Sequence, residues 1–405
     1  MLESITKYKD TPIGKIPMDW EVRKFKECAK FYSGGTPITS KKEYYGGNVP
    51  FIKSGEIYNN ITGQFLTKEG LDNSSAKMVQ KGDLLYALYG ANSGEVAISK
   101  INGAINQAIL CIKPEAEFCE TNYLSNFLIL EKSNIVQKYL QGGQGNLSAD
   151  IIKNLFVPLP PLPEQQKIAE VLSTWDKAIK ETSSIIKSLE KRNKALAFSM
   201  LTGKKRLKEF QGVKTKPVQI KDIAQEISLK NKSDEDYVVF SCTKYNGLVP
   251  SLEYFGKKIY SENLTTYKII KKNQFAYATN HIEEGSMGIL ERENIGLISP
   301  MYTVFDFNLG VNRDYIFKML KTDFYINEYK RRMEGSIDRR GGLRWSEFSK
   351  INIYLPSLEE QNKIAEIVNT ANKELQQYQQ KLNNLKTQKK GLMQQLLTGK
   401  VRVKF

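Results

Sequence analysis

Apolar residues recur at alternating spacings of four and three along two stretches of the chain, the heptad pattern of a coiled coil. In the first stretch the apolar seam positions are Ile168, Leu172, Trp175, Ile179, Ile186, Leu189 and Leu196. In the second they are Ile364, Val368, Leu375, Leu382, Leu385, Leu392 and Leu396. Prolines precede both stretches, and Gly203 and Gly399 follow them, which is typical of helix starts and stops. The pattern predicts two helices of about 38 residues, each about 57 Å long at 1.5 Å per residue.

A long amphipathic helix needs a partner for its apolar stripe, and each predicted helix finds a matching one in the same chain. We therefore expect an intramolecular two-helix coiled coil. Asn193 and Lys389 interrupt the apolar seam. Polar residues at such positions often fix register or orientation at a cost in stability. The alternative is that both are solvated positions near a frayed helix end.

An internal repeat explains why the two helices match. Residues 161–172 read PLPEQQKIAEVL and residues 357–368 read SLEEQNKIAEIV, while LTGK occurs at 201–204 and again at 397–400. Both pairs are 196 residues apart, because 360 − 164 and 397 − 201 give the same number. The sequence therefore predicts a variable domain at 1–157, a helical repeat at 158–204, a second variable domain at 205–354 and a second helical repeat at 355–405.

The two variable domains have the pattern of mixed, mostly β structure. Short apolar runs at 84–88 and 275–278 predict buried strands, and Gly, Asn and Ser turn signals separate such runs. Residues 123–130 and 315–320 look helical. Two divergent copies of one α+β fold are the simplest interpretation.

The charge balance favours a polyanionic partner. The 405 residues carry 60 Lys and Arg against 44 Asp and Glu, a formal net charge of +16. Cationic side chains displace counterions condensed on nucleic acid, although a generally basic protein would show the same excess. No run of 18 apolar residues and no signal-peptide core is present, so we expect a cytoplasmic protein without a membrane span. The four cysteines lack CxxC pairing, and we expect buried thiols.

Basic, aromatic and amide side chains near glycines are the candidates for DNA contact. Arg grips phosphates or guanine, Asn and Gln recognise adenine, and glycine turns let backbone approach a duplex. The alternative for any single residue is an ordinary solvated side chain. The candidates in the first variable domain are Lys41, Lys42, Tyr44, Tyr45, Lys53, Gln144 and Asn146. Those in the second are Tyr245, His281, Arg339, Arg340 and Arg344.

The sequence lacks the motifs of the common catalytic classes. There is no phosphate-binding Walker loop, no HExxH and only one histidine, His281, which argues against a multi-histidine metal site or a histidine-based triad. No S-adenosylmethionine-binding glycine motif and no Asn-Pro-Pro-Tyr/Phe methyltransferase signature occurs. We expect a non-catalytic chain with no cofactor and no metal of its own.

Taken together, the two EQ-containing helix starts, the two LTGK helix ends and the segments GGTPITSKKEYYGGNVPFIKSGEI and GLISPMYTVF resemble specificity subunits of type I restriction–modification systems. The resemblance covers essentially the whole chain. It implies two target-recognition domains, each reading half of a bipartite DNA site, and an antiparallel coiled coil that sets the half-site spacing. It also implies two modification subunits that methylate adenine with S-adenosylmethionine, and restriction subunits that use ATP and magnesium for translocation and cleavage.

Two other functions remain open from the sequence alone. An autonomous DNA-binding regulator would use the coiled coil for spacing only. A scaffold or inhibitory protein would use its basic surface to bind an acidic partner.

Overall fold

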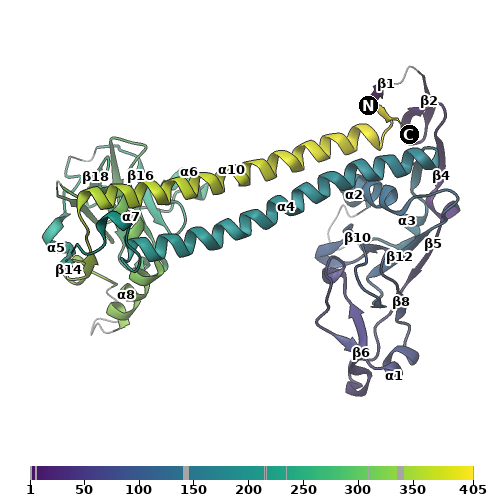
Figure 1. Ribbon diagram of the computed structural model, residues 1–405, viewed down its shortest axis with the longest axis horizontal. Helices are drawn as coiled ribbons and strands as arrows, with labels where there is room; N and C mark the ends of the chain where they lie inside the picture. The colour runs from purple at the N-terminus through teal and green to yellow at the C-terminus, as the bar shows by residue number, and fades with distance from the viewer. Residues whose placement is uncertain are drawn as a thin grey trace. The chain divides into compact units, whose positions relative to one another are not determined.

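Two long helices connect the sheet-rich parts of the chain in the computed structural model (Figure 1). Helix α4 (Leu162–Leu201) has 40 residues and α10 (Leu358–Leu396) has 39, close to the predicted lengths. The structure describes residues 2–4, 7–139, 146–213, 215, 217–233, 235–308, 310–334 and 342–404. Among these residues, no helix has the length and apolar character needed to cross a bilayer.

The chain divides into two compact units that differ from the predicted domains. Unit 1 comprises residues 1–183 and 380–405, and unit 2 comprises residues 184–379. Each unit therefore contains one variable domain together with half of α4 and half of α10. The helical repeats are parts of both units and not separate domains, because their apolar faces pack against the variable domains as well as against each other.

The two long helices are antiparallel in each unit. In unit 2, Arg192 pairs with Glu374 and, fourteen residues further along the chain, Arg206 pairs with Glu360. In unit 1, Glu164 at the start of α4 pairs with Arg402, and Asp176 further along α4 pairs with Lys389 of α10. Within each unit the partner number falls as the residue number rises, so the helices run in opposite directions. All predicted apolar seam residues are buried or half-buried, as a shared seam requires.

Unit 1 contains two four-stranded sheets. One has the order β10-β9-β12-β5 and the other β7-β6-β11-β8. Strand pairs β13–β4, β2–β3 and β1–β24 complete the unit, the last joining residues near the two chain ends. The strands are β1 (Leu2–Ser4), β2 (Tyr8–Thr11), β3 (Gly14–Pro17), β4 (Glu21–Lys24), β5 (Ala29–Ser33), β6 (Tyr45–Ile52), β7 (Phe65–Leu66), β8 (Lys77–Val79), β9 (Leu84–Ala87), β10 (Val96–Ile98), β11 (Gly103–Ile105), β12 (Ile109–Pro114), β13 (Phe156–Leu159) and β24 (Val401–Val403). The shorter helices are α1 (Lys68–Asp72), α2 (Thr121–Tyr139) and α3 (Ala149–Lys153).

Unit 2 repeats this topology. Its four-stranded sheets have the orders β20-β19-β22-β15 and β17-β16-β21-β18, and β14 pairs with β23. The strands are β14 (Pro217–Gln219), β15 (Ala224–Ile227), β16 (Val239–Thr243), β17 (Gly247–Pro250), β18 (Lys268–Lys271), β19 (Phe275–Ala278), β20 (Met287–Ile289), β21 (Ile295–Ile298), β22 (Tyr302–Phe307) and β23 (Asn352–Tyr354). The helices are α5 (Ile220–Ile223), α6 (Ser251–Phe255), α7 (Arg313–Leu320), α8 (Asp323–Glu334) and α9 (Trp345–Phe348).

The matching strand orders confirm two copies of one fold. In both units one strand pair is parallel, β6 with β11 and β16 with β21, while the other ladders within the four-stranded sheets are antiparallel. The predicted buried strands are β9 and β19, every residue of which is buried.

Each unit has a main hydrophobic core that combines variable-domain and helix residues. In unit 1, Ile168 and Leu172 of α4 and Leu396 of α10 join the cluster around Trp20. In unit 2, Met200 and Ile364 join the cluster around Tyr315, among others. Because strand β13 occupies residues 156–159, the first helix begins four residues later than the predicted repeat boundary at 158. All four cysteines are buried free thiols, as expected.

Candidate nucleic-acid interface

A buried carboxylate holds the start of each long helix. Glu164 of α4 is fully buried and accepts hydrogen bonds from the guanidinium of Arg402 and from the indole N–H of Trp20, the latter at 3.1 Å. Glu360 of α10 is likewise fully buried and accepts from Arg206, with Nε at 3.0 Å. Arg206 and Arg402 are 196 residues apart, as are the two glutamates, so the repeat contains one ion pair in two copies.

The glutamine after each glutamate fastens the helix to its variable domain. The Gln165 side-chain amide donates to the carbonyls of Pro160 and Phe118, at 2.9 and 2.8 Å, and its oxygen accepts from the backbone N–H of Glu120. Gln361 donates to the carbonyl of Pro356 and accepts from the backbone N–H of Asn312, both at 2.8 Å. The repeated EQ dipeptide is thus a positioning device for each variable domain.

Arg402 has opposite effects on its two carboxylate partners. Its hydrogen bonds to Asp19, at 2.8 Å, lower the pKa of that exposed carboxyl. Burial raises the pKa of Glu164, and the adjacent Arg402 opposes that shift without cancelling it. Two carboxylates around one guanidinium satisfy its planar donor fork, which favours a fixed geometry at this helix start.

The polar seam residues have specific partners. Asn193 is buried, and its side-chain N–H donates at 2.7 Å to the carbonyl of Ala371 on α10. Lys389 binds both carboxylate oxygens of Asp176 on α4, at 2.6 and 2.7 Å, and only 12% of its side chain is exposed. These contacts favour the first interpretation of the two residues, a role in register, over the solvated alternative.

The first-domain candidates lie mainly on the surface around β6. Lys41, Lys42 and Lys53 are exposed, and the Tyr45 hydroxyl donates to the Pro37 carbonyl at 2.8 Å. Tyr44 is only 5% exposed, which leaves little of its side chain available for the predicted DNA contact. Its ring is packed in the domain interior, where its hydroxyl accepts a 3.1 Å hydrogen bond from the Lys41 ammonium.

Asn146 lies next to a residue that is bound to the end of a buried strand. It is exposed and precedes Leu147, whose backbone N–H donates at 3.0 Å to the carbonyl of Leu88 at the end of β9. Gln144 lies outside the described residues.

The second-domain candidates include one pair that the fold brings together. The backbone N–H of Leu343 donates at 2.9 Å to the carbonyl of Thr279, just after β19, which is the counterpart of the Leu147 contact. This bond places the loop of the exposed Arg344 beside the turn of His281, whose imidazole is 65% exposed and 3.5 Å from Glu284. Arg339 and Arg340 lie outside the described residues.

Tyr245 lies on the turn between β16 and β17. It is 82% exposed, and the ammonium of Lys244 lies 5.2 Å from its ring centroid. A large exposed aromatic ring with a neighbouring cation suits stacking against a nucleobase beside a phosphate.

One group of ligand-type atoms occurs at the same turn as His281. His281, Glu283 and Glu284 bring ligand atoms within 4.8 Å of one another. Exposed acidic groups commonly form such clusters without an ion, and we assign no metal to it.

The roles of Glu164, Gln165, Arg206 and Arg402 were missed from the sequence. The signal was present, because EQ and LTGK-x-R occur in both repeats at the same offset. What the sequence did not reveal is that the end of one helical repeat binds the start of the other.

Comparisons with known proteins identify the class. Residues 17–191 match the family described as the type I restriction modification DNA specificity domain. The MjaVIII specificity subunit of Methanocaldococcus jannaschii is 25% identical over 412 residues, covering 96% of this chain and 95% of that protein. The MjaIX specificity subunit of the same organism is 33% identical over 198 residues, or 46% and 44% of the two chains. The crystal structure of the type I S subunit from M. genitalium is 16% identical, with a TM-score of 0.56 over 93% of this chain and 96% of that one.

Two sheet-rich units of one topology, each packed against part of both long helices, define a protein with duplicated α+β domains. The family-model match, the curated relatives and the solved structures all indicate a specificity subunit of the type I restriction–modification class, as the sequence resemblance predicted.

Proposed function

We propose that each variable domain reads one half of a bipartite site on double-stranded DNA. The observation that carries the proposal is the repeated topology of the two units, in which the strand order is the same and the connecting loops differ. Similar scaffolds with different loops suit the reading of two different half-sequences. The charge of +16 supplies the phosphate-binding component of affinity, which is steeply salt-dependent.

The helix pair sets the distance between the two half-sites in this proposal. At 1.5 Å per residue, the 40 residues of α4 extend about 60 Å. One turn of duplex advances about 34 Å, so a continuous rod of that length suits two readers at separate major grooves. The buried Asn193 and the Asp176–Lys389 pair support a single register of the two helices.

The remaining chemistry is assigned to partner subunits. Two modification subunits would dock on the helical region and methylate adenine with S-adenosylmethionine, and restriction subunits would add ATP- and magnesium-dependent translocation and cleavage. This chain would be a non-catalytic cytoplasmic subunit, without a cofactor of its own. Its relatives carry the name of specificity subunits of type I restriction enzymes, which supports this division of labour.

Mapping methylated adenines genome-wide, in cells with and without this chain, tests the proposal. The expected result is one bipartite motif that disappears when the chain is deleted. Replacing residues 1–157 by the corresponding domain of a relative should change one half of the motif and leave the other half and the spacer intact. Specific DNA binding by the chain alone, with no associated methyltransferase and no lost methylation, would instead indicate an autonomous regulator. No sequence-dependent DNA protection by the assembled complex would favour the scaffold.

A further inference from the structure

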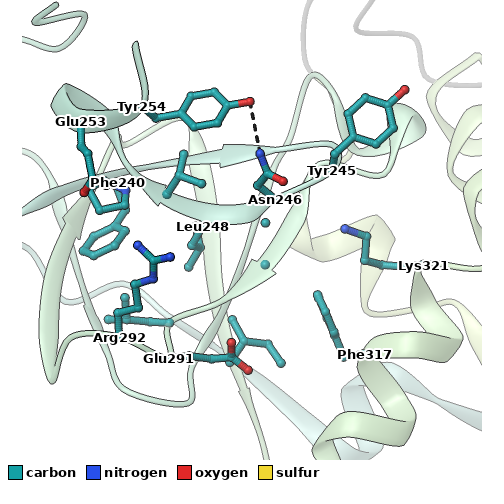
Figure 2. A pocket seen from close by; sticks show the side chains of 16 residues that line it. Phe240, Tyr245, Asn246, Leu248, Glu253, Tyr254, Glu291, Arg292, Phe317 and Lys321 are labelled. Atoms are coloured by element: carbon teal, nitrogen blue, oxygen red, sulfur yellow. Dashed lines mark hydrogen bonds between the residues drawn. The ribbon is translucent and has the colours of Figure 1, made fainter. Parts of the chain in front are cut away.

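Unit 2 contains a cavity that has no assigned role. It has a volume of about 700 Å³ and lies between the β16–β17 turn, α6, β20 and the end of α7. Figure 2 shows Asn246, Tyr254, Arg292 and Lys321 among the side chains that line it. Pockets of this size are typical of sites that enclose a small organic group.

A difference in loop length between the two units accompanies this cavity. The β16–β17 turn of unit 2 has three residues, 244–246, whereas its counterpart between β6 and β7 of unit 1 has twelve, 53–64. In unit 1 this longer loop contacts residues on both sides of β10, because the Tyr58 hydroxyl donates to Glu95, just before the strand, and the Tyr58 carbonyl accepts from Lys100, just after it. In unit 2 the corresponding strand, β20, contributes to the cavity wall instead. The shorter turn therefore leaves open a space that the unit 1 loop fills.

Two cationic side chains favour an anion in the cavity. The ammonium of Lys321 donates to the carbonyls of Lys244 and Met287, at 3.2 and 3.3 Å, and pairs with no carboxylate among the described residues. Burial partly desolvates this ammonium and lowers the pKa of Lys321. A phosphate oxygen would supply the charge partner that it lacks. The exposed Arg292 lines the same cavity and offers a planar fork of donors.

Aromatic and amide groups complete the walls. Tyr245 is 82% exposed and Tyr254 is 48% exposed, and Phe240 and Leu248 provide apolar surface between the polar groups. Asn246 donates to the Tyr254 hydroxyl at 3.4 Å, a weak contact that leaves its amide available to the edge of a base. An exposed carboxylate, Glu291, can accept from a base amino group.

We propose that this cavity binds one nucleobase, unstacked from the DNA duplex, together with its phosphate. The base stacks on the Tyr245 ring, the Asn246 amide forms hydrogen bonds with the edge of the base, and Arg292 and Lys321 bind the phosphate. This base is distinct from the adenine that a partner subunit would methylate, because it is held by the second recognition domain itself. Unstacking costs a few kcal/mol and makes readout depend on how easily the local base step opens. The inference rests on the proposed function, since it requires that residues 205–354 bind DNA.

The test uses the complete chain assembled with its methyltransferase subunits, without S-adenosylmethionine. Duplexes carry 2-aminopurine at one position at a time across the half-site read by the second domain, and permanganate reactivity reports unstacked thymines. The expected result is one strongly unstacked position besides the methylation target. Tyr245→Ala and Arg292→Ala should each reduce that signal about fivefold or more and weaken binding about tenfold, the order of one lost stacking or phosphate contact.

The design contains its own controls. Both substituted side chains are exposed, so the variants are expected to fold. Unstacking at the methylated adenine should persist in both variants, and Tyr58→Phe in the filled loop of unit 1 should change neither signal. Specific binding with unstacking only at the methylation target would overturn the inference and leave the proposed function intact. A second unstacked position that is unaffected by both substitutions would overturn it as well. Loss of all sequence-specific binding in the unsubstituted complex would refute the proposed function instead.

Discussion

Removing Arg402 should weaken unit 1 and make its stability depend on pH. In Arg402→Met, the carboxylate of Glu164 stays fully buried and keeps only the 3.1 Å hydrogen bond from Trp20. Removing one partner of a buried ion pair typically costs 3–5 kcal/mol, because the other charge is left without compensation. Arg402 is itself 15% exposed, so water reaches part of the pair. We therefore expect a loss of about 3 kcal/mol in the free energy of unfolding at pH 8.

The pH dependence follows from the direction of the Glu164 shift. Burial already raises the pKa of Glu164 with Arg402 in place, and removing Arg402 raises it further. A carboxyl whose pKa is higher in the folded state binds its proton where the unfolded chain has released it. The proton on the Glu164 carboxyl therefore stabilises the folded state at low pH. This stabilisation is lost as the pH rises through the folded-state pKa. The variant should recover more than half of its deficit between pH 8 and pH 5.

Urea denaturation of the complete chain at both pH values, followed by far-UV circular dichroism and by the total emission of its three tryptophans, measures this effect. A loss of about 3 kcal/mol corresponds to a midpoint shift of about 1 M urea for a unit of this size. Asp19→Asn is the matched control, because it removes the other, 52% exposed partner of Arg402 and should cost less than about 1 kcal/mol. A deficit no larger than that control, or one equal at pH 5 and pH 8, would refute the reasoning.

Four further outcomes are expected from the helices and the first domain. Asp176→Lys should lower the free energy of unfolding by about 1–2 kcal/mol, because the introduced ammonium would repel Lys389. In denaturation experiments the exchange variant Asp176→Lys/Lys389→Asp should recover most of this loss, and additive losses in the two single variants and the exchange variant would contradict the pairing. Inserting seven residues into both α4 and α10 keeps the heptad register and adds about 10 Å, so methylation mapping should find the spacer longer by about three base pairs with both half-sequences unchanged. Lys42→Ala should weaken binding to all DNA sequences alike and reduce the slope of log K against log salt concentration by about one; a loss that depends on the base sequence would argue against a phosphate contact. Tyr44→Ala should instead lower the free energy of unfolding by about 3 kcal/mol, because the ring is buried.

The helices and the repeated organisation were predictable because they depend on local periodicity. A seam spacing of four and three fixes which face of a helix is apolar, whatever the rest of the chain does. The proline and glycine signals placed the first helix end within a few residues of Leu201. The predicted start of the first helix was less accurate, because β13 extends into the proline-rich segment before the helix and pairs with β4.

Which segments of the chain come together in each unit was not predictable from local periodicity. Arg402 lies near the chain end and Glu164 near the start of α4, and only the folded helix pair brings them together. The burial of Tyr44 was not predictable for a related reason. Its neighbours Lys41, Lys42 and Tyr45 are exposed or half-buried, and nothing in a run of polar and aromatic residues marks the one ring that faces inward.

Although the two helical repeats are alike, their charged seam contacts are complementary and not duplicated. In unit 1, Asp176 of α4 meets Lys389 of α10, and in unit 2, Arg192 of α4 meets Glu374 of α10. The repeat positions equivalent to these four residues, 196 removed, are Asn372, Asn193, Gln388 and Ala178. A pairing of either helix with a copy of itself would therefore lack both ion pairs, whereas the Glu–Arg pairs at the helix starts would be kept. The Glu–Arg pairs at the helix starts are common to both repeats, whereas the ion pairs between the helices distinguish α4 from α10. One chain can therefore contain two similar helical repeats and still specify that α4 pairs with α10.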